Sequence, residues 1–227
     1  MFLSIDTSTS NAGVALSNQD QIFISETWHS TSSHTAELMP AVSSLLAQTS
    51  ISLGDLEGIC VAAGPGGFSS LRVGMSVAKG ISIASSTPIA SIGTLDLEAF
   101  PNLGNGMAVC AIIPSGRSDV AYALFNKNSE RVAEDSITSP LELIATIEEP
   151  TIFCGEGLLA HSEIIEKSLG QLSKIIHTEP SDRLYTLAKL GTQRLNNGRS
   201  DNIDELQPNY IKLPSIGGPK KQGNIAQ

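Results

Sequence analysis

Four glycines and a proline stand close together in the stretch GPGGFSSLRVG, residues 64–74, between two apolar runs. A glycine-rich turn can bind phosphate when a helix begins directly after it, because the first backbone N–H groups of the helix point at the anion. The stretch lacks the lysine of a GxxxxGK[ST] phosphate loop, and Ser69 stands where the dinucleotide motif GxGxxG needs its third glycine. On the residues alone we therefore favour a turn that connects a buried strand to a helix.

Asp6 is a second candidate for phosphate chemistry, because it ends an apolar run and is followed by Thr7 and Ser8. Phosphoryl transfer needs several positioned groups around magnesium and phosphate, and a single carboxylate is too few. A carboxylate at the end of a strand also stabilises turns by accepting nearby hydrogen bonds. We favour this turn-stabilising role for Asp6.

The other residues that carry chemistry form no recognisable catalytic or metal-binding pattern. His29 and His34 are five residues apart, which fits neither common zinc spacing, and the cysteines include no CxxC pair. The serines occur without a GxSxG elbow. We therefore predict no catalytic and no metal-ligating residues, and we interpret Cys60, Cys110 and Cys154 as buried, reduced thiols.

The charge balance argues against a protein that binds nucleic acid without a partner protein. The chain has 227 residues and a net charge of −9, and among its 14 lysines and arginines only Lys220–Lys221 form a cluster. An apolar content of 41% predicts a globular protein, and no apolar run is long enough to cross a bilayer. The start MFLSIDTSTS has neither the basic segment nor the cleavage site of a signal peptide, so we expect a cytoplasmic protein.

Hydrophobic periodicity predicts two sets of elements in the same order. In the first set the expected strands are 2–8, 12–18, 21–29, 58–63 and 88–93, and the expected helices are about 35–48, with Thr35 as N-cap, and 69–86. In the second set the expected strands are 107–114, 118–126, 130–138, 150–157 and 174–179, and the expected helices are 140–149, 160–169 and 181–198. This order predicts an α/β protein of two related halves that join near residue 100.

Three small residues, Gly74, Ala78 and Ser82, lie four apart on one side of the helix expected at 69–86. Small side chains at this spacing let another backbone approach closely. The neighbour can be a partner helix or another part of the same chain, and the sequence leaves both open.

Four stretches, FLSIDTSTSNAGVAL, HTAELMPAVSSLL, AAGPGGFSSLRVGMSVAKGISIA and PIASIGTLDLEA, resemble the TsaB (YeaZ) family of the bacterial tRNA threonylcarbamoyladenosine pathway. The resemblance covers residues 1–99, although Gly67, Ser69 and Ser70 depart from the family's loop GPGSFTGLRVG. The second half matches loosely. FCGEGL resembles a Gly-x-Gly strand end, and QPNYIKLP resembles the family's final Pro-x-Tyr-x-Arg segment, with Lys212 in place of the arginine.

The resemblance implies an actin-like (ASKHA, RNase H-like) α/β fold of two related halves, each a mixed sheet flanked by helices. The expected domains are an N-terminal half, 1–99, a divergent C-terminal half, 100–214, and a flexible tail, 215–227. The helix at 181–198 is a candidate to pack back on the first half.

The resemblance also implies a non-catalytic subunit that binds the transferase TsaD and, through it, the ATPase TsaE. That complex transfers a threonylcarbamoyl group to the adenosine beside the anticodon of tRNAs that read ANN codons. In this interpretation the chain meets tRNA only through the complex, has no membrane partner, and forms a homodimer in isolation. No cofactor is expected, and weak binding of ATP or ADP stays open.

The resemblance implies that the interface with TsaD lies on the helices at about 35–48 and 69–86. The candidate interface residues are His34, Glu37, Leu38, Ala41, Val42, Leu45, Arg72, Val73, Met75, Ser76, Ala78 and Lys79. Periodicity alone does not say which of the apolar members point outward. The resemblance also implies a degenerate phosphate loop, directly before the start of the partner-binding helix. Its residues are Asp6, Thr7, Ser8, Gly64, Gly66 and Gly67.

Two alternatives come from other functional classes. A small-molecule kinase of the actin-like superfamily needs acidic groups of both halves to hold magnesium, and Pro114 stands where the second-half carboxylate is expected. A glycoprotease-like metallopeptidase needs paired histidines, and PIASIGTLDLEAF, where TsaD-type proteins carry HxxxH, has none. Asp96 and Glu98 in that stretch point in different directions whether it is a strand or a helix.

Overall fold

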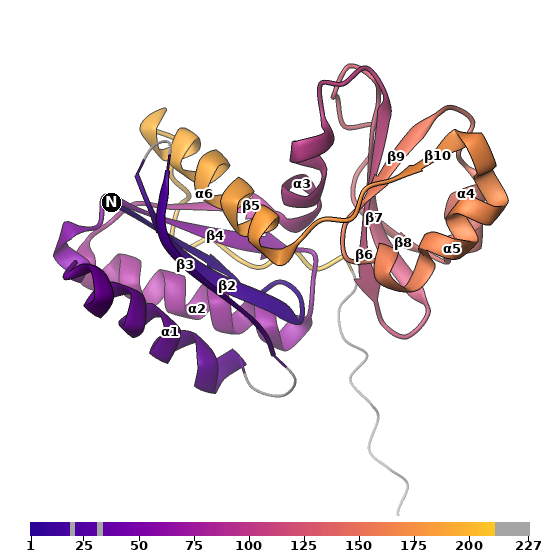
Figure 1. The fold of residues 1–227 in the computed structure, drawn as a ribbon. Coiled ribbons are helices and arrows are strands. Elements are labelled where there is room, and N and C mark those ends of the chain that lie inside the picture. Colours follow the sequence, from indigo (N-terminus) through magenta and orange to yellow (C-terminus); the bar gives the residue numbers. More distant parts are fainter. Residues whose placement is uncertain (19–20, 31–33, 212–227) are drawn as a thin grey trace, which may run out of the picture.

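The computed structural model of the chain describes residues 1–18, 21–30 and 34–211 (Figure 1). The first half contains β1 (Phe2–Asp6), β2 (Asn11–Ser17), β3 (Ile22–His29), α1 (His34–Thr49), β4 (Gly58–Gly64), α2 (Phe68–Ser85), β5 (Ile89–Gly93) and α3 (Thr94–Ala99). The second half contains β6 (Ala108–Ser115), β7 (Asp119–Phe125), β8 (Ser136–Thr138), α4 (Pro140–Ala145), β9 (Thr151–Cys154), α5 (Leu158–Leu169), β10 (Ser173–Ile175) and α6 (Pro180–Asn196). The predicted tail 215–227, with Lys220–Lys221, and the Lys212 position lie outside the described residues.

Within the described residues the two halves have the same sheet topology. The first sheet has the order β3-β2-β1-β4-β5 and the second has the order β10-β9-β6-β7-β8. In the first, β1 pairs antiparallel with β2 and parallel with β4. In the second, β6 pairs antiparallel with β7 and parallel with β9. The duplication predicted from element order is therefore confirmed.

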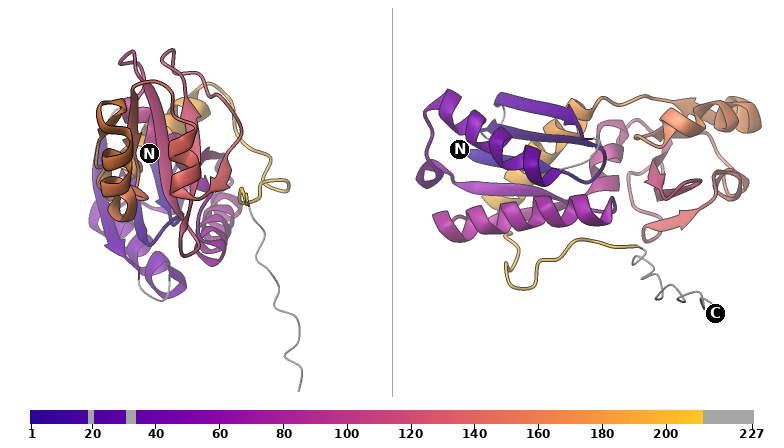
Figure 2. Two further views of the ribbon diagram at one scale, coloured as in Figure 1. Left: turned by 90° about the vertical axis from the view of Figure 1, so that its right-hand side faces the viewer. Right: turned by 90° about the horizontal axis from the view of Figure 1, so that it is seen from below.

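The central strands of the first sheet are buried on both faces, which explains the continuous apolar run of β4. Ile59 and Val61 point into a core shared with α1 and α2, whereas Cys60 and Ala62 point into a smaller core shared with α6. Helix α6 lies close to the strands, and Gly191 allows this approach, since a Cβ there would come within 2.3 Å of the Cys60 Sγ atom. The sheet thus forms the middle layer of this half (Figure 2).

The second sheet is covered by α4 and α5 on one face and by α3 on the other. Leu143, Leu158 and Ile165 pack on the first of these faces. On the other, Leu95 and Ala99 of α3 join the core of the second sheet, whereas Leu97 joins the core beneath α6. Helix α3 therefore contacts both halves, and α6, which follows the second sheet in the chain, packs on the first sheet (Figure 1).

Several predicted element boundaries are wrong. The strand expected at 130–138 is reduced to β8 and to an isolated antiparallel bridge between Arg131 and Phe125. The strand expected at 174–179 ends at Ile175, and the helix α3 was not expected. Thr35 is not an N-cap, since α1 already begins at His34. No helix in the described part of the chain combines the length and the hydropathy that crossing a membrane requires.

Candidate functional site

The glycine loop between β4 and α2 is packed against the chain's own backbone. The Gly67 N–H donates to the Ser8 carbonyl oxygen at 2.9 Å, and a Cβ on Gly66 would lie 2.0 Å from that same oxygen. Gly64 has a φ of +104°, and a Cβ there would come within 2.7 Å of the Asn209 carbonyl oxygen. The loop therefore needs its glycines for close internal contacts, and one of its N–H donors is already occupied.

Thr7 connects the end of β1 to α2. Its hydroxyl donates to the Ser70 carbonyl oxygen at 2.7 Å, and a Cβ on Gly74 would come within 2.3 Å of the Thr7 Oγ1 atom. Ala78 and Ser82, on the same side of α2, are also buried. The small residues of α2 thus serve packing within the chain, which decides between the two alternatives that the sequence left open.

Asp6 has the predicted turn-stabilising role and a second role that was not predicted. One carboxylate oxygen accepts hydrogen bonds from the Ser8 N–H at 2.9 Å and the Ser8 hydroxyl at 2.7 Å. The other accepts from the Arg183 Nε–H at 2.5 Å. Arg183 lies in the first turn of α6 and is fully buried, as is Asp6.

The Arg183 guanidinium donates hydrogen bonds to carboxylates from both halves of the molecule. Its Nη1 donates to Glu98 Oε1 at 3.0 Å and to Glu156 Oε1 at 2.5 Å. Its Nη2 donates to the Thr9 hydroxyl at 3.0 Å and the Asn11 carbonyl oxygen at 2.5 Å. The expectation of a single carboxylate is wrong, because Glu98 on α3 and Glu156 after β9 join Asp6. We call Arg183, Asp6, Glu98 and Glu156 the junction cluster.

Burial and charge act in opposite directions in the junction cluster. Burial raises the pKa of the Glu98 carboxyl, and the Arg183 guanidinium and the Thr178 hydroxyl oppose that rise only in part. Burial disfavours the charged form of Arg183, but the surrounding carboxylates outweigh it and raise its pKa. Arg183 is therefore a permanent cation in a site where three carboxylates converge.

A cavity of about 200 Å³ lies beside the junction cluster, between the glycine loop and the second half. Its lining consists of Ser8, Thr9, Ser10, His34, Gly66, Gly67, Ser70, Pro114 and Glu156. Pro114 thus lies opposite the loop and supplies no ligating side chain. Burial lowers the pKa of His34, which disfavours a positive charge in the cavity.

Half of the candidate interface side chains are core residues and not surface residues. Leu38, Ala41, Val42, Leu45, Met75 and Ala78 are buried in the core between the first sheet and its helices. Their predicted role as a partner surface is wrong, because the first sheet already covers them. The apolar stripe of each helix faces the sheet, as expected for an amphipathic helix on a sheet.

The remaining interface candidates are at least partly exposed, and several contact neighbouring segments. The Glu37 carboxylate accepts from the Trp28 Nε1–H at 3.1 Å. Lys79 Nζ donates to the Leu206 carbonyl oxygen at 3.1 Å, and Arg72 Nε donates to the Tyr210 hydroxyl at 3.1 Å. The segment after α6 therefore runs along α2 toward the second half (Figure 2). His34, Val73 and Ser76 complete this set.

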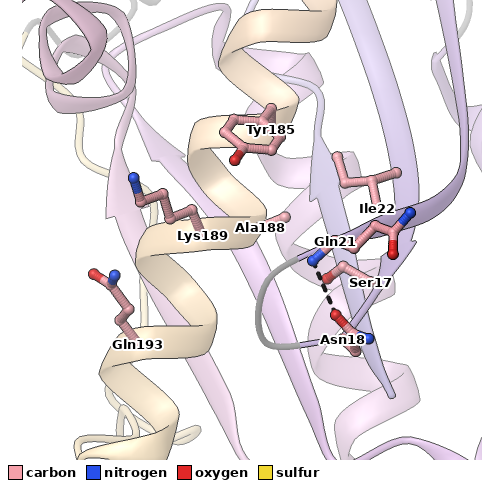
Figure 3. Close-up of a pocket in the computed structure, with 8 residues that line it drawn as sticks. All are labelled: Ser17, Asn18, Gln21, Ile22, Tyr185, Ala188, Lys189 and Gln193. Atoms are coloured by element: carbon pink, nitrogen blue, oxygen red, sulfur yellow. Dashed lines mark hydrogen bonds between the residues drawn. The ribbon is translucent and has the colours of Figure 1, made fainter.

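A second cavity, of about 190 Å³, lies between α6 and the hairpin of β2 and β3 (Figure 3). Tyr185, Lys189 and Gln193 line it from α6, and the Lys189 Nζ atom is 5.2 Å from the centre of the Phe100 ring. Among the described residues, its lining contains no carboxylate and no histidine. This cavity is less suited to chemistry than the junction cluster.

The described residues contain no group of three or more His, Cys, Asp and Glu side chains placed to hold a metal ion. Cys60, Cys110 and Cys154 are buried free thiols, as predicted. Burial raises the pKa of the Cys60 thiol to about 12. Asp96 and Glu98 point in different directions, as expected, since Asp96 pairs with Arg131 and Glu98 with Arg183.

Arg183, Glu98 and Glu156 are members of one site that the sequence does not predict. The signal for Glu156 was its position in FCGEGL, between two glycines at a strand end. A Cβ on Gly155 would lie 2.4 Å from the Ile112 carbonyl oxygen, so this turn is tightly packed and fixes the place of Glu156. Arg183 carried no signal, because an arginine in the first turn of an amphipathic helix is normally solvent-exposed.

Comparison with known proteins identifies relatives over most of the chain. The family profile described as "TsaD: tRNA N6-adenosine threonylcarbamoyltransferase" matches residues 28–215. The tRNA threonylcarbamoyladenosine biosynthesis protein TsaB of Bacillus subtilis (strain 168) is 28% identical over 218 residues, which cover 93% of each chain. The protein of the same name from Haemophilus influenzae is 26% identical and covers 74% of this chain and 76% of its own.

Solved structures share the two-half architecture. YeaZ from Pseudomonas aeruginosa superposes with a TM-score of 0.72 at 20% identity, over 92% of this chain and 98% of that one. The ethanolamine utilization protein EutJ from Carboxydothermus hydrogenoformans superposes with a TM-score of 0.54 at 13% identity, over 83% and 89%. The expected actin-like fold of two related halves, each a mixed sheet flanked by helices, is confirmed.

Proposed function

Because this chain belongs to the TsaB family of tRNA threonylcarbamoyladenosine biosynthesis proteins, within the wider TsaD family, we propose that it is a binding subunit of that pathway and not its transferase. Its partner in this proposal is TsaD, and the contact surface is the outer side of α1 and α2. Three features of the chain support the proposal: the surface of these helices, the occupied junction cluster, and the packed glycine loop.

The outer side of α1 and α2 is the observation that carries the proposal. The solvent-exposed positions at helical spacing include Met39, Ser43 and Ala47 on α1, and Arg72, Ser76, Gly80 and Ile83 on α2. Only Arg72 among these is charged, and Ile83 is 67% exposed. A helix side that faces water is normally rich in charged residues, and an interface core is poor in them. We call these residues the α1–α2 face.

A comparison within the molecule shows that the low charge of the α1–α2 face is local. The exposed side of α5 carries Glu163, Glu166 and Lys167. Small residues such as Ser76 and Gly80 also allow the backbone of a second helix to approach closely. A helical surface of TsaD is therefore the occupant that fits this face, and a second copy of the chain fits it when TsaD is absent.

The junction cluster supports a non-catalytic role for the chain. Its carboxylates already bind the Arg183 guanidinium, so they are not available to magnesium and phosphate. The glycine loop directs a donor to Ser8 and not to a ligand. We therefore propose that the chain needs no cofactor, and that any ATP or ADP binding is weak and not productive. These same contacts weigh against the kinase alternative, and no arrangement of the described residues favours the metallopeptidase alternative.

The remaining partners follow from the charge of the chain. A net charge of −9 gives it little affinity of its own for tRNA, so tRNA and TsaE are reached through TsaD in the proposed complex. A role in tRNA modification is consistent with the expected cytoplasmic location.

The proposal is tested by mixing the purified chain with TsaD of the same organism and measuring molar mass by size exclusion with light scattering. A one-to-one complex is expected. Ser76→Arg places a long charged side chain on the α1–α2 face and should weaken binding at least 100-fold, as for truncation of a hot spot of about 3 kcal/mol. Leu159→Arg, at an exposed position of α5, is the matched control and should bind like wild type. Equal binding by both variants would place the contact elsewhere.

A further inference from the structure

The junction cluster joins segments that are distant in sequence and belong to different halves. Asp6, Thr9 and Asn11 come from the first sheet and its connecting turn, and Glu156 comes from the turn after β9 in the second sheet. Arg183 contacts all four at the start of α6. The Thr9 hydroxyl also donates to Glu156 Oε1 at 2.7 Å, so the two halves are linked directly as well.

The hydrogen-bonding capacity of Arg183 is completely used. A guanidinium has five N–H donors in a rigid plane, and the five contacts to Asp6, Glu98, Glu156, Thr9 and Asn11 match that number. The side chain is 2% exposed, as are those of Asp6 and Glu98. Such a cation cannot leave without exposing converging carboxylates to one another in a buried site.

We propose that the junction between the halves is a cation-binding site whose ligand is the chain's own Arg183, and that this occupied site fixes the arrangement of the two halves without any bound nucleotide or metal. The site is built for a planar guanidinium, because its acceptors surround all three nitrogen atoms. The proposal does not depend on binding to TsaD.

The direct test measures the distance between the halves. Spin labels on Ser25→Cys in β3 and Lys167→Cys in α5 report it by pulsed electron paramagnetic resonance, since both positions are exposed, both lie outside the α1–α2 face, and the native cysteines are buried. Labelled chain is mixed with an excess of unlabelled chain, so that distances between two copies do not contribute. The otherwise unchanged labelled chain should give one narrow distance distribution, the same with and without ATP and magnesium. Arg183→Gln should broaden the distribution and lower Tm by about 10 °C.

Arg194→Gln is the matched control, because Arg194 lies on the same helix and also forms an ion pair, with Asp201. Its other contact is the Ser91 carbonyl oxygen of the first sheet, so no bond to the second half is lost. This variant should have a lower Tm, but its distance distribution should be as narrow as that of the wild type. Unchanged width in Arg183→Gln, or a narrow distribution only with nucleotide present, would overturn the proposal.

Chemical rescue tests the identity of the ligand. In Arg183→Ala, methylguanidinium at millimolar concentration should narrow the distribution again, whereas methylammonium should not, because it lacks the planar set of donors. If the Arg183 variants fail to fold, Glu156→Ala removes only the acceptor of the second half and should also broaden the distribution. A Glu156→Ala distribution as narrow as wild type would contradict the proposal.

Discussion

The carbonyl oxygen of Ser8 occupies the place where a side chain of Gly66 would begin, since a Cβ on Gly66 would lie only 2.0 Å from it. Through this contact the glycine loop packs against the turn that follows β1, next to the junction cluster. The glycine loop, which the sequence predicts to be a turn between a buried strand and a helix, therefore serves internal packing and sets the start of α2.

Gly66→Ala should destabilise the chain by about 3 kcal/mol, because the backbone of Ser8 would have to move. Gly80→Ala is the matched control on α2, since nothing lies within 4 Å of a Cβ there. It should stabilise the helix by about 0.5–1 kcal/mol. Urea unfolding of both variants measures these changes, and a neutral Gly66→Ala would show that the loop is not held as described.

The pH dependence of stability should report the buried Glu98. Burial raises its folded pKa above the ordinary value of 4.5, so the folded chain binds this proton more tightly than the unfolded chain. Ionised Glu98 therefore lowers stability at neutral pH, and the loss disappears as pH falls through the folded pKa toward 4.5. Wild type should gain stability relative to Glu98→Gln as the pH falls from 7 to 4.5. A difference in Tm that stays constant over this range would refute the expectation.

The buried thiols should be unreactive in the folded chain. The thiolate is the nucleophilic form, and burial raises the pKa of Cys60 to about 12 from an ordinary value of 9.0. An aromatic disulfide reagent at pH 8 should label no cysteine before unfolding and three after unfolding in guanidinium chloride. Rapid labelling of one thiol in the native chain would mean that a core is open to solvent.

The segment after α6 should contribute to stability through Tyr210. Its ring lies 4.9 Å from the Phe68 ring, centre to centre, and Arg72 lies over Phe68 at 4.0 Å. Tyr210→Ala should cost about 1–2 kcal/mol, whereas Tyr210→Phe, which loses only an exposed hydrogen bond to Arg72, should cost about 0.5 kcal/mol or less. Equal losses in the two variants would assign the effect to the hydroxyl and not to the ring.

Much of the fold could be predicted because it depends on local patterns. The apolar run of β4 reflects burial on both faces of the sheet, and the helical spacing of Leu38, Val42 and Leu45 reflects burial against one neighbouring layer. The repeated order of elements then gave the two halves. Periodicity could not say whether the apolar stripe of each helix meets the sheet or a partner, and the structure shows that it meets the sheet.

The junction cluster could not be predicted, because it depends on contacts between distant segments. Arg183 and Asp6 are 177 residues apart, and their pairing requires α6 to return from the second half to the first sheet. Glu98 is buried only because the unpredicted helix α3 turns it toward Arg183. A charged residue in sequence is expected at the surface, so its burial is visible only after the halves are assembled.

We propose that the chain acts by binding and not by catalysis, and a threonylcarbamoyl transfer assay on tRNA separates these two roles. The assay compares the chain alone, TsaD alone and the two together, with TsaE, ATP and the threonylcarbamoyl donor present throughout. We expect no product from the chain alone, more product from the mixture than from TsaD alone, and loss of that gain with Ser76→Arg. Product formation by the chain without TsaD, at a rate typical of an enzyme, would contradict the claim.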